Sequence, residues 1–99
     1  DPPALVVVSQ VRTADAFRAR EDYAACAAAI QNLALALTVH GLHSKWSTGG
    51  VTRHPSTYEA LGIDESQEEI IGFVWAGYAA NEVPQVGRPP LHTFVRYAP

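Results

Sequence analysis

The sequence predicts one layered α+β domain with the element order β-α-β-α-β and an extended carboxy-terminal tail, an order that also suits an α/β architecture. Two apolar runs rich in β-branched residues, at 5–11 and 70–78, have the composition of buried strands. Between them lies an alanine-rich run at 22–40, and alanine is the best helix former. After residue 79 the chain is rich in proline, which favours an extended conformation.

The first strand is expected at residues 5–11, where the nearly continuous apolar character indicates cover on both faces. Residues 12–21 are charged and less periodic, so they are predicted to form a solvated connector with at most a helical turn. The domain is therefore expected to begin with one strand and an irregular link to the long helix.

The long helix is expected at residues 22–40, with Asp22 as its N-cap and Gly41 just beyond its end. It is apolar nearly all round, which predicts a buried helix. A membrane span is disfavoured because alanine is weakly hydrophobic and the polar pair at 31–32 falls in mid-run. Gln31 and Asn32 are expected to bond to backbone or across a subunit interface, and direct contact with a ligand is the alternative.

A short strand is predicted at 42–46, followed by a loop at 47–50. Pro55 suits the first position of a helix of about two turns, and Gly62 closes that helix. The acidic stretch at 64–69 is predicted to be a solvated turn before the strand at 70–78.

Glycines inside the last strand, Gly72 and Gly77, suggest β-bulges or the close approach of a ligand or backbone. Beyond this strand, residues 91–97 are predicted as a possible edge strand within the tail.

The composition excludes several classes of function. Apolar residues form 47% of the chain, which excludes disorder. The net charge is −3, the isoelectric point is about 5.7 and the seven Lys and Arg residues are scattered, so a nucleic-acid partner is not expected. The one cysteine, Cys26, is expected to be a small buried hydrophobe, and the four histidines lack the spacing of a metal site.

The start of the chain predicts that it is part of something longer. There is no methionine, and the sequence opens Asp1-Pro2-Pro3-Ala4. Three strands and two helices also leave large apolar faces without a partner. We therefore expect a single incomplete domain over 1–99, made of a strand and connector (1–21), a central interface helix (22–41), a strand-loop-helix-strand unit (42–78) and a tail (79–99).

The stretch from Trp46 to Gly50 is the first candidate binding segment. Backbone N–H groups in a glycine loop can form an anion-binding concavity, and the hydroxyls of Ser47 and Thr48 add donors. Trp46 could stack on an aromatic ring, and the alternative is a core tryptophan before an ordinary turn. In the tail, Arg88 and Arg96 are either solvated charges or phosphate ligands; the residues leave both open.

Several segments together resemble the FMN-dependent nitroreductase family. The helix around Gln31-Asn32-Leu33 is similar to a QNL helix of that family, and GLHSKWSTG at 41–49 resembles its Gly-Leu…Trp-x-x-Gly strand and loop. The other similar segments occur in the family's order: YEALGI at 58–63, IIGFVWAGY at 70–78, VGRPPL at 86–91 and FVRY at 94–97.

The resemblance implies half of a nitroreductase-like layered sandwich, in which a homodimer holds FMN at its interface. It implies that the long helix carries dimer contacts, that Arg88 binds the FMN phosphate with Arg96 as a second candidate, and that four residues line the flavin site: Trp46, Ser47, Thr48 and Gly49. NADH or NADPH would reduce the FMN, and nitro or quinone acceptors would reoxidise it in a ping-pong cycle. No side chain of this chain is needed as a catalytic acid or base, because solvent can supply protons.

The chain also departs from the family. The amino-terminal half, which carries arginine and serine ligands of FMN in the family, has no counterpart, and Ser47 stands where small members often have arginine. The resemblance therefore implies a cytoplasmic oxidoreductase that needs its other half, through a second segment or subunit. The alternative is a non-enzymatic fragment or oligomerisation module that binds no flavin.

Overall fold

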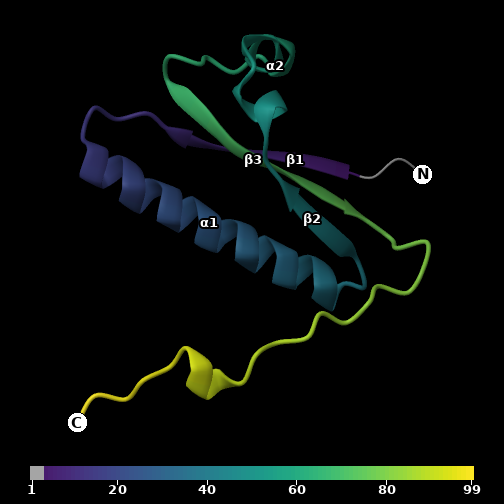
Figure 1. Cartoon of the computed structure of the whole chain (residues 1–99). Coiled ribbons are helices and arrows are strands. Elements are labelled where there is room, and N and C mark those ends of the chain that lie inside the picture. Colours follow the sequence, from purple (N-terminus) through teal and green to yellow (C-terminus); the bar gives the residue numbers. More distant parts are fainter. Residues whose placement is uncertain (1–3) are drawn as a thin grey trace.

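The structure, a computed structural model, describes residues 4–99 and consists of an antiparallel three-stranded sheet with a long helix lying across one face (Figure 1). The strands are β1 (Ala4–Val11), β2 (His43–Ser47) and β3 (Glu68–Gly77), in the order β1-β3-β2. The helices are α1 (Ala16–Val39) and α2 (Pro55–Leu61). The predicted α+β layering and the predicted element order are confirmed.

Strand β3 forms the centre of the fold because both of its faces are covered. On one face Ile71 and Val74 pack against Ile30 of α1. On the other face Ile70 and Phe73 pack against Tyr58 of α2. The members of each pair are three residues apart, which strict alternation along a strand does not give, so a bulge in β3 sets the two layers of the small core.

A β-bulge interrupts β3 where it faces β1. Val8 is opposite Gly72 while the next residue, Ser9, is opposite Ile70, so Ile71 is an extra residue without a partner across the ladder. Gly72 also lies against the Nε1–Cδ1 side of the Trp46 indole, and a Cβ built there would lie 2.6 Å from the ring's Cδ1. The sequence predicted a bulge or the close approach of a ligand or backbone at Gly72. The structure has a bulge beside it, at Ile71, and the group that approaches Gly72 is the Trp46 side chain.

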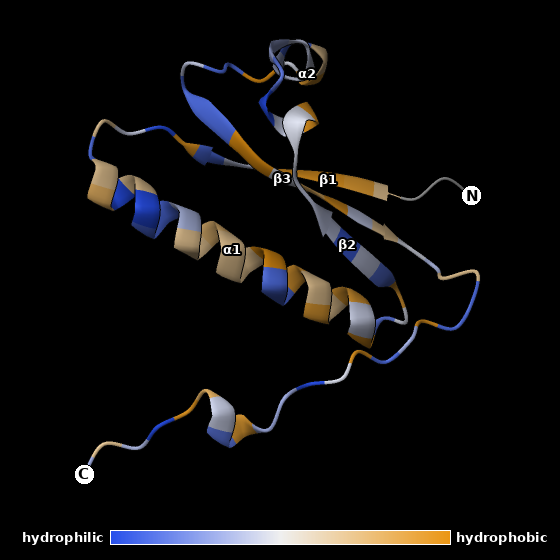
Figure 2. Ribbon diagram, viewed as in Figure 1, coloured by the Kyte–Doolittle hydropathy of each residue, from blue (hydrophilic) through white to orange (hydrophobic). Residues whose placement is uncertain are grey.

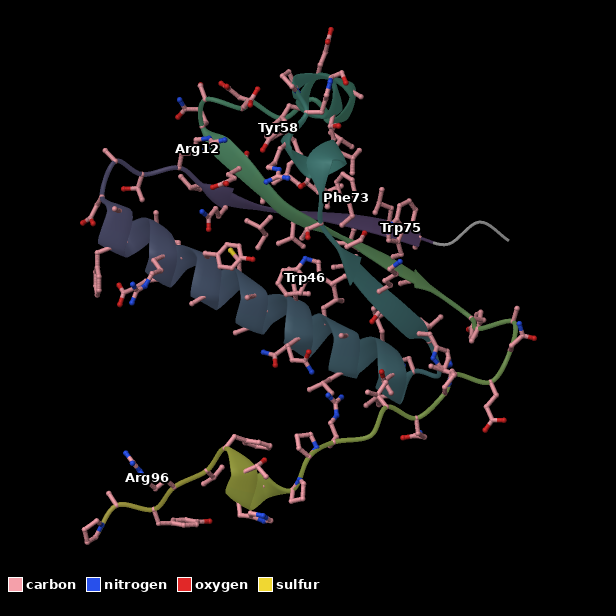
Figure 3. The ribbon with its side chains drawn as sticks, in the orientation of Figure 1. Arg12, Trp46, Tyr58, Phe73, Trp75 and Arg96 are labelled. Atoms are coloured by element: carbon pink, nitrogen blue, oxygen red, sulfur yellow. The ribbon has the colours of Figure 1, made fainter. Side chains whose placement is uncertain are left out.

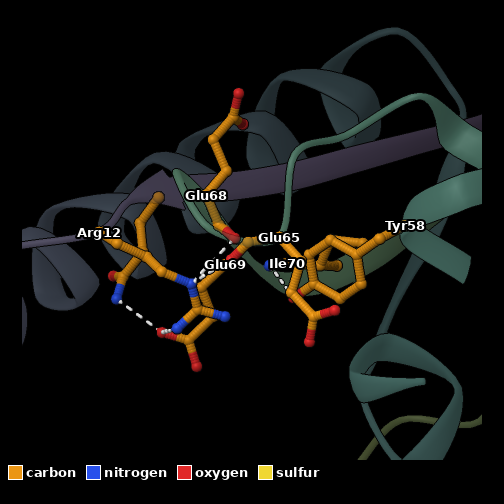
Figure 4. Close-up of polar contacts among 7 residues, drawn as sticks. Arg12, Tyr58, Glu65, Glu68, Glu69 and Ile70 are labelled. Carbon is orange, nitrogen blue, oxygen red and sulfur yellow. Dashed lines mark hydrogen bonds and ion pairs between the residues drawn. The ribbon is translucent and has the colours of Figure 1, made fainter. Parts of the chain in front are cut away.

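The phenol of Tyr58 secures the same region from the opposite face. Its hydroxyl oxygen accepts a hydrogen bond of 2.9 Å from the backbone N–H of Ile70, and the side chain is only 4% exposed (Figure 4). Helix α2 itself follows the prediction: Pro55 begins it, and Gly62 ends it in the left-handed conformation at φ 67°. The helix therefore serves to place one buried hydroxyl at the bulge.

The turn before β3 is shorter than predicted, since the strand already begins at Glu68. Asp64 organises this turn: its carboxylate accepts hydrogen bonds from the hydroxyl and the backbone N–H of Ser66, at 2.7 and 2.9 Å. These bonds hold the pKa of the Asp64 carboxyl below its usual value.

Helix α1 begins earlier than the sequence predicted. Asp15 is its N-cap and accepts hydrogen bonds from the N–H groups of Phe17 and Arg18. The predicted N-cap, Asp22, lies inside the helix, where it pairs with Arg18 at 3.8 Å. Residues 12–15 form the predicted exposed connector, but the prediction was wrong for 16–21, which contain no helix breaker and belong to α1 because Asp15 supplies the cap.

The predicted burial of the long helix is not found. Within α1 only Ile30 is buried, whereas Leu35 and Val39 are 55% and 84% exposed. By length and composition alone α1 could also cross a membrane. Here it packs on the sheet through Cys26 and Leu33, which are half-buried, so the expected burial of Cys26 is only partly met.

The prediction of cover on both faces of the first strand was also wrong, because Leu5 and Val6 are each 41% exposed. The tail runs away from the sheet as an extended segment (Figures 1 and 2). It contains a 3-10 turn at Leu91–Thr93 in place of the predicted edge strand. Both errors share a cause: a strand or a buried face needs a second surface, and none is supplied within residues 4–99.

Replacing Gly72 with alanine should destabilise the fold by about 1–3 kcal/mol, because the new methyl group overlaps the Trp46 ring. Urea denaturation measures the loss. In a Trp46→Ala background the same change should cost less than about 0.5 kcal/mol, because the overlapping ring is gone. An equal cost in both backgrounds would show that the indole contact is not the cause.

Replacing Tyr58 with phenylalanine should cost about 1–3 kcal/mol, because the buried N–H of Ile70 loses its acceptor. Thermal and urea denaturation measure the change. Tyr78→Phe is the matched control, since Tyr78 is 82% exposed and should tolerate the change. A Tyr58→Phe protein as stable as the control would contradict this role for the hydroxyl.

Candidate functional site

The segment after β2 forms a tight corner at the edge of the sheet. Gly49 has φ 142° and ψ −165°, a conformation that is essentially restricted to glycine. The chain then enters a 3-10 turn at Gly50–Arg53. Thr52 is 4% exposed and closes the corner: its hydroxyl and its N–H donate to the Gly49 carbonyl at 2.8 and 3.2 Å. The backbone of the corner is therefore fixed by this chain alone.

Trp46 and Ser47 leave β2 on opposite faces of the sheet. Trp46 lies between the sheet and α1, and Trp75 lies on the other face (Figure 3). The Ser47 hydroxyl accepts a hydrogen bond from the Trp75 indole N–H at 3.1 Å and lies 3.5 Å from the Phe73 carbonyl. Ser47 is thus engaged by its own chain, whereas Trp46 keeps 40% of its surface exposed.

Thr48 and Gly49 line a cavity of about 230 Å³ beside the corner. The residues around it come from α1, the corner, the 3-10 turn and β3: Tyr23, Thr48, Gly49, Thr52, Arg53, Glu69, Ile70 and Ile71. Pockets for small molecules usually have about 300–1,000 Å³, so this cavity suits one part of a cofactor. Its hydroxyl, backbone N–H, phenol and guanidinium groups are the donors that an oxygen-rich ring or phosphate requires.

Arg53 is the residue in this cavity that the sequence analysis missed. It stands one 3-10 turn after the Thr48–Gly49 loop, which brings its guanidinium group to the same cavity. The spacing of four residues from Gly49 was visible in the sequence. What the sequence did not reveal was that Thr52 would fold these residues back onto the loop.

Arg88 does not reach the corner of its own chain. It lines a separate cavity with Thr38 and His43, at the other end of β2 from Ser47. Those two ends of the strand are about 13 Å apart, from the rise per residue of a strand. Arg96 lies farther away in the tail, across α1 from Trp46 (Figure 3). Within one chain the candidate residues therefore fall into two separate groups.

Among residues 4–99, no three His, Cys, Asp or Glu side chains group in a way that could hold a metal ion. Just after the corner, the Ser56 hydroxyl lies 2.7 Å from Nδ1 of His54, and the same ring nitrogen accepts from the Ser56 N–H as the N-cap of α2. The site can bind and orient a group through donors, a cation and aromatic surface, so the chemistry would belong to what it binds.

These features define a class of structure: a layered α+β fold in which hydrogen-bond donors line a corner at the edge of an antiparallel sheet. The comparisons with known proteins give the family. The family model described as Nitroreductase family matches residues 1–78. The chain belongs to the nitroreductase family, as the sequence motifs indicated.

A solved structure has the same fold. The crystal structure of the nitroreductase-like family protein from Bacillus cereus superposes with a TM-score of 0.86 at 28% identity, over 98% of this chain. This chain spans 51% of the length of that protein. No curated protein matches the chain. Family and fold together suggest the class of flavin-dependent oxidoreductases.

Gly49→Ala should destabilise the fold by about 1–3 kcal/mol, because alanine cannot adopt the φ and ψ of Gly49 without strain. Gly50→Ala is the control, because a Cβ at Gly50 meets open space and its φ is not positive. Urea denaturation of both variants checks the prediction. Equal stability of the two variants would mean that the corner relaxes without cost.

Proposed function

We propose that this chain forms part of an FMN-dependent oxidoreductase, which passes a hydride from NADH or NADPH through FMN to nitro or quinone acceptors. The observation that carries the proposal is the family match over residues 1–78, since that span contains the whole corner from Trp46 to Gly50. The fold shared with the Bacillus cereus protein over 98% of this chain supports it. The acceptors and the choice of nicotinamide follow from the resemblance alone.

The residues fit a role in binding rather than in chemistry. The half-exposed Trp46 ring and the donors of Thr48 and Gly49 would line the flavin ring. Ser47 would act by fixing Trp75 and the end of β2, because its hydroxyl is already engaged. FMN would supply the hydride transfer, and this chain would bind the ring, orient it and limit access of water.

Arg88 and the corner line separate cavities at opposite ends of β2, an arrangement that favours an FMN site shared between two subunits. We therefore propose a homodimer in which a second copy supplies Arg88, or Arg96, to the phosphate. Large apolar side chains on α1 and in the tail are available for this contact: Phe17, Leu35, Val39, Val86, Phe94 and Tyr97, all more than half exposed. A further segment, as long as the half of the Bacillus cereus protein that this chain does not span, would complete the site. Nitroreductases are typically soluble, and a cytoplasmic location stays a prediction.

The second candidate function is an assembly module that binds no flavin. One observation favours it: the Ser47 hydroxyl, a predicted flavin contact, is used inside the chain. In this case the exposed face of α1 would serve association alone.

Titration of the chain with FMN, followed by quenching of flavin fluorescence, separates the two functions. The oxidoreductase proposal predicts saturable binding with a Kd below ~1 mM, and at least tenfold weaker binding by Trp46→Ala. Sedimentation in the same buffer should show a dimer whose formation FMN strengthens. Tyr78→Phe, a surface change away from the corner, should bind as the unchanged chain does. Absence of saturable binding together with a stable oligomer would favour the assembly module.

A further inference from the structure

The position of Arg53 is fixed by the corner itself. Thr52, its neighbour, is buried and donates both its hydroxyl and its N–H to the Gly49 carbonyl. Arg53 follows directly and lines the same cavity as Thr48 and Gly49. Its side chain therefore starts from a backbone that is held against the loop rather than from a mobile segment.

The guanidinium group of Arg53 is not engaged in an ion pair within residues 4–99. Glu69 lines the same cavity, but its carboxylate is engaged elsewhere: Arg12 lies 3.9 Å from Oε2, and the Gln10 amide donates to the same oxygen at 3.2 Å (Figure 4). The cavity beside the corner thus contains an uncommitted guanidinium group and an acid that has its own partners.

The walls of this cavity suit the edge of a flat ring. Tyr23 of α1 and the bulged residue Ile71 contribute aromatic and aliphatic surface, and Thr48 contributes a hydroxyl. The planar guanidinium group can donate two parallel hydrogen bonds to adjacent oxygen or nitrogen acceptors on such an edge.

We infer that Arg53 pairs with the negative charge that the flavin ring acquires on two-electron reduction, and that it thereby makes this corner favour the reduced cofactor. The inference rests on the proposed function and deepens it, since it names the residue that would set the redox balance of the site. Arg88 of the same chain cannot take this role, because it lines a different cavity at the far end of β2. A cation beside the polar edge of a flavin is one means by which a protein tunes its electronics.

The inference has a thermodynamic consequence. A charge that interacts with the reduced ring and little with the neutral oxidised ring must tighten binding of the reduced form. By linkage, the ratio of the two dissociation constants equals the shift in the two-electron equilibrium of the bound cofactor. A tenfold ratio corresponds to about 30 mV for a two-electron couple.

The test compares Arg53→Gln, Arg53→Lys and the full unchanged chain. The dissociation constants of oxidised and dithionite-reduced FMN and riboflavin are measured for each. Arg53→Gln should weaken binding of both reduced flavins about tenfold more than binding of the oxidised ones, and Arg53→Lys should retain most of the preference because it keeps the charge. Arg20→Gln on α1 is the matched control, an exposed arginine that should leave all four constants unchanged.

Three other outcomes would contradict the inference, and the pattern of dissociation constants distinguishes them. If Arg53→Gln weakened binding of reduced and oxidised flavin equally, the Arg53 charge would not interact preferentially with the reduced ring. A loss for FMN without a loss for riboflavin would place Arg53 on the phosphate. Failure of the unchanged chain to bind any flavin, with circular dichroism showing that it is folded, would favour the assembly module over the proposed function and would leave Arg53 without this role.

Discussion

The contact between Trp46 and Gly72 is the constraint on which the rest of the structure depends. Gly72 has no side chain, so the Nε1 edge of the indole can approach β3 closely between the sheet and α1. The bulge at Ile71 increases the local twist, and the Tyr58 hydroxyl satisfies the N–H of Ile70 from the other face. Together they hold the end of β2 in place, and the direction of β2 decides where Thr48 and Gly49 leave the sheet.

The corner follows from that arrangement. Because side chains alternate along a strand, the indole of Trp46 on one face forces Ser47 onto the other, where it bonds to Trp75. The donors left for a ligand are therefore those beyond the strand, on Thr48, Gly49 and Arg53. The oxidoreductase proposal requires only that these donors bind and orient the flavin, since the flavin carries its own reactive atoms.

Local signals in the sequence predicted much of the fold. Pro55 and Gly62 bounded α2 and alanine content located most of α1, because each of these signals depends on neighbours in the chain. The start of α1 was missed because Asp15 competes as a cap with Asp22, and only the backbone decides between them. The exposure of α1 and the absence of the predicted edge strand at 91–97 depend on partner surfaces. The position of Arg53 depends on the hydrogen bond from Thr52 to the Gly49 carbonyl. No local sequence pattern predicts either.

The exposed apolar face of α1 and the open corner are linked in the proposed function. Helix α1 has 24 residues and buries only Ile30, so its outer face gains nothing from folding of this chain alone. The cavity beside the corner has room for part of a cofactor, and Arg88 lines a separate cavity. The proposed homodimer would bring Arg88 of a second copy to that cofactor. A ligand that binds only the assembled state stabilises that state by mass action. If the proposed function holds, association through α1 and retention of a flavin would be a single equilibrium, and neither surface would need to bind strongly alone.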